Sequence, residues 1–177
     1  MKPNVAIQRL LGSWTSPCYV MMVGAPGSGK STFIKKFVAN ITDQFIVAST
    51  DDLIEEAAKK MGLTYSQAWD KVNQKTIKKQ MDANIAAAIH ARKTIFHDQT
   101  NMGSKKRSSQ LAIVPESYFK ICLDFTVDDK VLKERLDVRA KQTGKIIPPF
   151  VLKNMLNSYV APSKNEGFDL ILDIDNT

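Results

Sequence analysis

Short apolar runs of strand length alternate along this chain with longer stretches in which apolar residues recur at helical spacing. The apolar runs predict five strands, at Cys18 to Val23, Phe45 to Ser49, Lys93 to Asp98, Tyr118 to Leu123 and Leu170 to Asp173. The helical spacing predicts helices at Ser31 to Asn40, Asp52 to Met61, Tyr65 to Ala91, Lys105 to Val114, Asp128 to Lys141 and Pro149 to Tyr159. This alternation is typical of an α/β fold, in which helices cover a parallel sheet.

A glycine-rich loop connects the first predicted strand to the first predicted helix. From Gly24 to Ser31 it reads G-A-P-G-S-G-K-S, which matches the phosphate-binding loop (P-loop) pattern G-x-x-x-x-G-K-[ST]. In such a loop the lysine, here Lys30, reaches the β and γ phosphates, and the Ser31 hydroxyl binds Mg²⁺. The pattern therefore predicts a site for a nucleoside triphosphate. Its candidate binding residues are Gly24, Ala25, Pro26, Gly27, Ser28, Gly29, Lys30, Ser31 and Thr32.

Carboxylates follow the second and third predicted strands, at the edge of the sheet where ligands bind in open α/β folds. A kinase needs a carboxylate that orients the accepting hydroxyl and takes its proton. We assign this role of general base to Asp51, and the role of helix cap to Asp52. By spacing alone, either aspartate could instead serve only as a cap. Asp98 is expected to help Ser31 hold Mg²⁺.

Asp98 also opens a polar turn, D-Q-T-N, in which Thr100 and Asn101 could contact the acceptor. A basic cluster, K-K-R, follows and ends at Arg107. On charge pattern alone, this cluster fits a solvated helical turn as well as it fits a phosphate contact. His97 lies in a buried strand and is expected to be a packed, hydrogen-bonded residue. We therefore leave both histidines out of the candidate site.

The predicted helix from Asp128 carries two arginines, Arg135 and Arg139, which lie four positions apart and hence on one face. We expect residues 139–147 to form a lid. An arginine from a closing segment neutralises charge on the transferred phosphate in many phosphoryl transferases. Arg135 and Arg139 are the candidates for this phosphate contact. A charged, exposed helix would explain the same spacing.

Composition sets broader limits. The 177 residues suit one domain, with residues 1–17 as an N-terminal extension, and no apolar run approaches membrane-spanning length. We therefore expect a cytoplasmic protein with no membrane partner. Cys18 and Cys122 lie in apolar runs, which predicts buried free thiols. The net charge of +7 favours a polyanionic partner such as nucleic acid without requiring one.

Residues 18–173 resemble the kinase domain of polynucleotide 5′-hydroxyl kinases, of both the bacteriophage and the mammalian end-healing types. The similarity covers the P-loop with its continuation T-F-I-K-K, the D-D pair at Asp51, and D-Q-T-N followed by an arginine six residues beyond Asn101. It also includes the arginine-rich lid and the tail from Tyr159 to Asp169.

This resemblance implies a P-loop kinase fold, with a five-stranded parallel sheet and a helical lid, that uses ATP and Mg²⁺. It implies that Asp51 is the general base and that Arg139 lies on the phosphates. Thr100, Asn101 and Arg107 would bind the acceptor, a 5′-hydroxyl end of DNA or RNA. A phage-encoded enzyme acting inside a host cell fits the same resemblance.

Two departures concern the acceptor. The phage enzymes carry arginine three residues past the base and immediately before it, where this chain has Ile54 and Thr50. Because an arginine at the first place could pair with the acceptor's 3′-phosphate, we expect this chain to prefer oligonucleotides over nucleoside 3′-monophosphates.

The terminal D-x-D-x-T (Asp173, Asp175, Thr177) is the nucleophile motif of haloacid-dehalogenase-type phosphatases. We interpret it as coincidental or vestigial, because the sheet and partner acids of such a site are not found with it.

The sequence thus predicts an ATP- and Mg²⁺-dependent kinase that phosphorylates 5′-hydroxyl ends of DNA or RNA. One alternative is a small-molecule kinase for a nucleoside, a sugar or an antibiotic, since related P-loop folds serve all these acceptors. Another is a nucleotide-binding accessory protein without catalytic activity, against which the combination of Asp51 and Arg139 argues.

Overall fold

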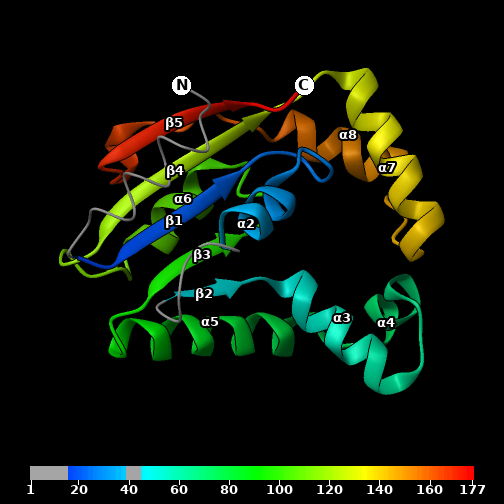
Figure 1. Ribbon diagram of the computed structural model, residues 1–177, viewed down its shortest axis with the longest axis horizontal. Helices are drawn as coiled ribbons and strands as arrows, with labels where there is room; N and C mark the ends of the chain where they lie inside the picture. Colours follow the sequence, from blue (N-terminus) through cyan, green and yellow to red (C-terminus); the bar gives the residue numbers. More distant parts are fainter. Residues whose placement is uncertain (1–15, 39–44) are drawn as a thin grey trace.

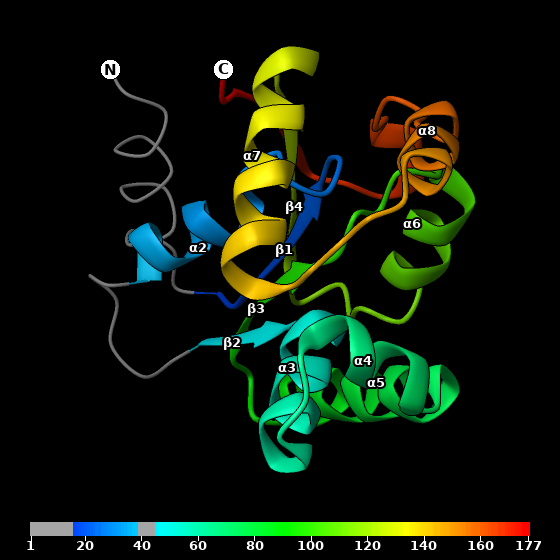
Figure 2. The same ribbon diagram turned by 90° about the vertical axis from the view of Figure 1, so that its right-hand side faces the viewer.

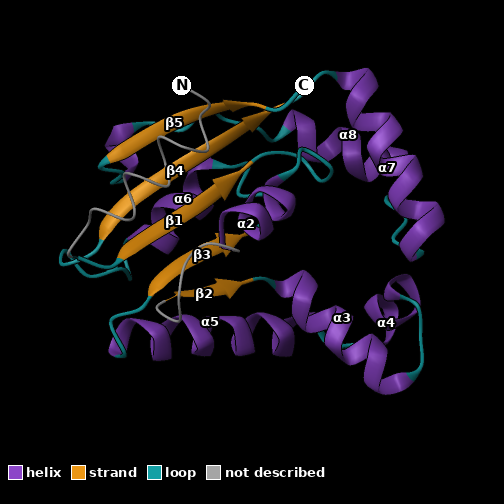
Figure 3. Ribbon diagram, in the orientation of Figure 1, coloured by secondary structure: helices purple, strands orange, loops and turns teal. Residues whose placement is uncertain are grey.

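A computed structural model of the protein describes residues 16–38 and 45–177. Their strands form one parallel sheet in the order β2-β3-β1-β4-β5 (Figures 1 and 3). The strands are β1 (Cys18–Val23), β2 (Phe45–Ala48), β3 (Thr94–Asp98), β4 (Phe119–Thr126) and β5 (Leu170–Asp175). The predicted α/β fold with a five-stranded parallel sheet is therefore confirmed.

The central strand β1 is buried along its whole length, which explains why all six of its residues are apolar. Its side chains alternate between two core clusters. Tyr19 and Met21 belong to the cluster that also includes residues of α5 and α6, whereas Val20 and Met22 belong to the cluster that includes Phe33 of α2. Helices therefore cover both faces of the sheet (Figure 2).

Seven α-helices are present among the described residues. They are α2 (Lys30–Val38), α3 (Thr50–Met61), α4 (Tyr65–Lys71), α5 (Gln74–His90), α6 (Ser104–Leu111), α7 (Asp129–Thr143) and α8 (Pro149–Asn157). A short 3-10 helix, η1 (Lys164–Glu166), precedes β5. α7 stands at the carboxyl edge of the sheet and its C-terminal end approaches α3 and α4 (Figures 1 and 2).

Helix caps account for the main differences from the predicted elements. The single helix predicted from Tyr65 to Ala91 is wrong. The helix is interrupted between α4 and α5, where Asn73 caps α5 by accepting hydrogen bonds from the N–H groups of Lys75 and Thr76. Asp52 is not the cap of α3; Ser49 is, since its hydroxyl accepts from the Asp52 N–H at 3.2 Å. The predicted cap at Asp128 and the early position of Pro149 in α8 are confirmed.

Three other predictions concern the N-terminal extension and the end of the first helix, the cysteines, and membrane-spanning segments. Residues 1–15 of the expected N-terminal extension, and the expected end of the first helix at residues 39 and 40, lie outside the described residues. Cys18 and Cys122 are buried free thiols, as predicted. Within the described ranges, no helix is both long and apolar enough to cross a membrane.

Candidate active site

The P-loop lies between β1 and α2 at the carboxyl edge of the sheet (Figure 1). Two of its glycines have a positive φ and close neighbours. Gly24 has a φ of 139°, and a Cβ there would lie 2.8 Å from the carbonyl oxygen of Phe125. Gly29 has a φ of 98°, and its Cβ would lie 2.0 Å from Nδ2 of Asn176. Glycine is therefore favoured at these two positions both by the backbone conformation and by the close neighbouring atoms.

Lys30 is folded back onto the loop that precedes it. Its Nζ donates to the carbonyl oxygens of Gly24 and Ala25, both at 2.8 Å, and to Ser28 Oγ at 3.4 Å. Burial lowers the pKa of Lys30 to about 8, although the charges of Asp98 and Asp51 act in the opposite direction. A bound phosphate would favour the protonated form of this lysine, which is what a triphosphate site requires.

Ser31 and Asp98, the predicted Mg²⁺ residues, lie in contact. Ser31 is in the first turn of α2, and Asp98 is the last residue of β3. The Ser31 hydroxyl donates to Asp98 Oδ2 at 2.6 Å. Burial raises the pKa of Asp98, against the lowering effects of the Ser31 hydrogen bond and the Lys30 charge. A hydroxyl and a carboxylate are hard oxygen donors of the kind that Mg²⁺ prefers beside a phosphate. These residues therefore fit the predicted metal.

Asp51 lies in the first turn of α3 and faces cations from the lid. Its Oδ1 accepts a hydrogen bond from the hydroxyl of Tyr65 at 2.7 Å, and its Oδ2 accepts one from Nζ of Lys145. Nη2 of Arg139 is 3.9 Å from the same Oδ2. Burial acts to raise the pKa of Asp51, but these three neighbours outweigh it and hold the pKa below its usual value. The Asp51 side chain is still 43% exposed, so its carboxylate remains accessible to an acceptor.

Arg135 lies beside the P-loop rather than beside Asp51. Its Nη2 donates to the backbone oxygen of Asn176 at 2.8 Å, and its buried Nη1 has no hydrogen-bond partner among the described residues. A Cβ built at Gly29 would lie 3.9 Å from that Nη1. Asn176 itself donates through Nδ2 to the Ser28 carbonyl at 2.7 Å. An unpaired guanidinium N–H next to the loop fits a nucleotide phosphate.

Two of the predicted acceptor residues form hydrogen bonds that support the P-loop. The carbonyl oxygen of Thr100 accepts from the Gly24 N–H at 3.0 Å. Asn101 is 1% exposed, and its Nδ2 donates to the Met22 carbonyl at 2.8 Å. These hydrogen bonds link the turn after β3 to the end of β1, so this turn holds the loop in place.

Arg107, the third predicted acceptor residue, is fully buried. Its Nε and Nη2 donate to the two carboxylate oxygens of Glu166, each at 2.7 Å. Its Nη1 donates to the carbonyl oxygens of Asn101 and Met102, both at 3.0 Å. With five N–H donors and no exposed surface, this guanidinium is committed to joining α6, η1 and the turn after β3. The expectation that Arg107 contacts the acceptor does not fit this position.

Three residues near the site had no predicted role: Tyr65, Lys145 and Asn176. Lys145 lies within the predicted lid, but a lysine that follows a glycine cap gives no signal of its partner in sequence.

His97 is buried as expected, with a ring centroid 5.9 Å from that of Tyr19, but neither ring nitrogen has a hydrogen-bond partner among the described residues. Burial lowers the pKa of His97 to about 3, so it stays neutral and outside the site.

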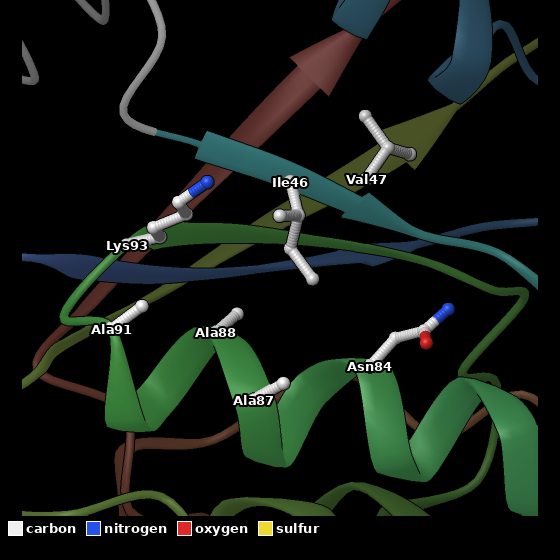
Figure 4. Close-up of a pocket in the computed structure, with 7 residues that line it drawn as sticks. All are labelled: Ile46, Val47, Asn84, Ala87, Ala88, Ala91 and Lys93. Carbon is white, nitrogen blue, oxygen red and sulfur yellow. The ribbon is translucent and has the colours of Figure 1, made fainter.

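A pocket between β2 and α5 lies elsewhere (Figure 4). It is lined by Ile46, Val47, Asn84, Ala87, Ala88, Ala91 and Lys93. Lys93 precedes the start of β3, so the pocket extends to the amino end of that strand, whereas the P-loop and Asp98 lie at carboxyl ends. Its lining holds no carboxylate, and we assign it no part in the chemistry.

The sequence of residues 20–162 matches the model of a protein family described as AAA domain. The chain belongs to this family. The match includes the P-loop, and a P-loop family of this kind implies ATP as the nucleotide and usually Mg²⁺ with it.

Relatives of this AAA domain act on different molecules. The L-seryl-tRNA(Sec) kinase of Methanococcus maripaludis is 26% identical over 156 residues, which cover 85% of this chain and 56% of that protein. The chain thus spans little more than half the length of this curated relative. A chain in the structure of the Pnkp1/Rnl/Hen1 RNA repair complex is 25% identical, with a TM-score of 0.66 over 82% of this chain and 45% of its own. A gluconokinase from Sinorhizobium meliloti 1021 shares the fold, with 18% identity and a TM-score of 0.54 over 90% of this chain and 83% of its own.

The position of Lys30 predicts how ATP binding depends on pH. Because the pKa of Lys30 is about 8, the lysine is charged below that pH, and ATP affinity should be constant there. Above it, affinity should fall by up to about tenfold per pH unit, as binding must then be accompanied by proton uptake. Calorimetric titration of ATP on both sides of pH 8 would measure this change. In Lys30→Arg the charge persists, so the decline should vanish; a wild-type affinity that stays constant throughout would contradict the assignment.

The burial of Arg107 predicts an effect on stability. Arg107→Met should lower the free energy of unfolding by about 3–5 kcal/mol, because it leaves the Glu166 carboxylate buried and unpaired. Chemical denaturation would measure the loss, and the exposed neighbour Lys105→Met serves as the control. If Arg107→Met kept wild-type stability and only raised KM for the acceptor, the acceptor role would be restored.

Proposed function

We propose that this chain transfers the γ-phosphoryl group of ATP to the 5′-hydroxyl end of a DNA or RNA strand. The observation that carries the proposal is the accessible Asp51 carboxylate, which lies at the same sheet edge as the Ser31–Asp98 pair and faces the lid. A carboxylate in this position can orient a hydroxyl for attack on a phosphate held by the P-loop.

Each of these side chains would have its own role in phosphoryl transfer. Lys30 and Arg135 would bind the phosphates, and Arg139 would stabilise the charge that develops during transfer. Ser31 and Asp98 would hold Mg²⁺, which when bound neutralises charge on the β and γ phosphates. The acceptor oxygen forms its bond to the γ phosphorus as the bond to the β-phosphate oxygen breaks. Asp51 takes the hydroxyl proton, and ADP leaves.

Nucleic acid is the favoured acceptor for two reasons. The resemblance to polynucleotide kinases includes the D-D and D-Q-T-N segments and the lid, and not only the P-loop. The net charge of +7 suits a polyanion. A small-molecule kinase is the second candidate, because the gluconokinase shares the fold. The free thiols at Cys18 and Cys122 fit action in a reducing compartment such as the cytoplasm.

A panel of acceptors tests the proposal directly. Transfer of labelled phosphate from ATP should be efficient with 5′-hydroxyl oligonucleotides and absent or weak with gluconate and other sugars. Oligonucleotides that already carry a 5′-phosphate serve as the matched control, because they lack the accepting group. Transfer to a sugar with none to any 5′-hydroxyl would replace the proposal with the second candidate. ATP binding with no transfer to any acceptor would favour a non-catalytic accessory protein.

Asp51→Asn should reduce transfer by about a hundredfold or more while ATP binding stays close to that of the wild type. The amide keeps the size of the carboxylate but cannot accept the proton. Single-turnover transfer and ATP titration would measure the two effects separately. Asp52→Asn, an exposed position in the same helical turn, is the control and should retain activity. Wild-type turnover in Asp51→Asn would remove this residue from the mechanism.

A further inference from the structure

Lys145 is a lid cation that is buried against the candidate base. Only 6% of its side chain is exposed, and its Nζ donates to Asp51 Oδ2. The same Nζ lies 3.8 Å from the centre of the Tyr65 ring. An ammonium over an aromatic face is held by the electrostatic attraction of the ring, in addition to its ion pair. This lysine therefore contacts both Asp51 and the hydroxyl-bearing residue that binds the other Asp51 oxygen.

The backbone around Lys145 is fixed by contacts that do not involve its own side chain. The Ser66 hydroxyl donates to the Gly144 carbonyl at 2.6 Å, and the Ile146 N–H donates to Ser66 Oγ at 3.4 Å. Gly144 takes the left-handed conformation that ends α7. The end of the lid is thus docked on the first turn of α4. Removal of the Lys145 ammonium should leave this docking in place.

The Asp51–Lys145 ion pair is not an effective arrangement for proton transfer, because a carboxylate neutralised by an ammonium attracts a proton weakly. An acceptor with its own negative charge could change this. The stem of a lysine is flexible and its three N–H donors can be redirected, so the ammonium could move from Asp51 to a nearby phosphate. Lys145 would then hold the acceptor and leave Asp51 free to act as the base.

Ile54 shows why such a cation must come from the lid. The side chain at this position is fully buried and belongs to a small core cluster with Ala58 and Ala68, between α3 and α4. An arginine there would have to enter this apolar cluster. The face of α3 that carries Asp51 therefore receives its cation from outside the helix, and Lys145 lies there.

We propose that Lys145 is the acceptor-side cation of this kinase, with an ammonium that binds the phosphate 3′ to the accepting nucleoside and otherwise pairs with Asp51. The inference rests on the proposed transfer to 5′-hydroxyl ends. It changes the expectation drawn from Ile54, because a nucleoside 3′-monophosphate then has a partner and should be a much better acceptor than the unphosphorylated nucleoside.

The test compares thymidine, thymidine 3′-monophosphate and an oligothymidylate as acceptors. Lys145→Met keeps the unbranched stem of the side chain, one atom shorter, and removes its charge. It should lower kcat/KM for thymidine 3′-monophosphate by about tenfold or more, mainly through KM. It should not lower kcat/KM for thymidine, because thymidine has no phosphate to draw the ammonium away from Asp51. Lys145→Arg should recover part of the loss. Lys141→Met, at an exposed lysine in the last turn of α7, is the matched control.

Other outcomes would overturn the inference. An equal loss of kcat/KM for thymidine and for its 3′-monophosphate in Lys145→Met would mean that the lysine only supports the lid. Unchanged values for both would mean that it plays no part. If the wild-type protein phosphorylates the oligothymidylate, either of these results rejects only the inference about Lys145 and leaves the proposed function standing. If the wild-type protein phosphorylates none of the three acceptors, the inference and the proposed function fail together.

Discussion

Parallel pairing of β3 with β2 on one side and with β1 on the other determines where the P-loop, the candidate base and Asp98 lie. Because the strands run in the same direction, the P-loop after β1, the α3 turn after β2 and Asp98 at the end of β3 all meet at one edge of the sheet. The turn after β3 then hydrogen-bonds back to β1 and the P-loop through Asn101 and Thr100. The phosphate site and the candidate base are therefore positioned by the same backbone pairing.

The site has charges of both signs in close contact. Lys30, Arg139 and Lys145 lie near Asp51 and Asp98, and these charges contribute to the shifted pKa values of Lys30, Asp51 and Asp98. Burial disfavours the charged forms of Lys30 and Asp98, whereas the neighbouring cations favour the ionised form of Asp51. A triphosphate with its metal would satisfy the cations and change this balance.

The sheet, the P-loop and the pairing of Ser31 with Asp98 could all be predicted from sequence, because each depends on a local pattern or on the rule that parallel strands share an edge. The break before α5 was missed because the apolar spacing continues across Asn73, although asparagine is a favoured cap. The functions of Arg107 and Lys145 could not be read from sequence. Their partners, Glu166 and Asp51, lie far along the chain, and only the packing of η1 and the lid brings them together.

The contact between Asn176 and the P-loop has a practical consequence. Asn176 donates to the Ser28 carbonyl and its own backbone oxygen accepts from Arg135, so the last strand is attached to the nucleotide site by a side chain one residue before Thr177. In recombinant variants, a substitution that alters the packing of β5 would therefore reach the phosphate loop through Asn176, and would change ATP binding without touching the loop itself.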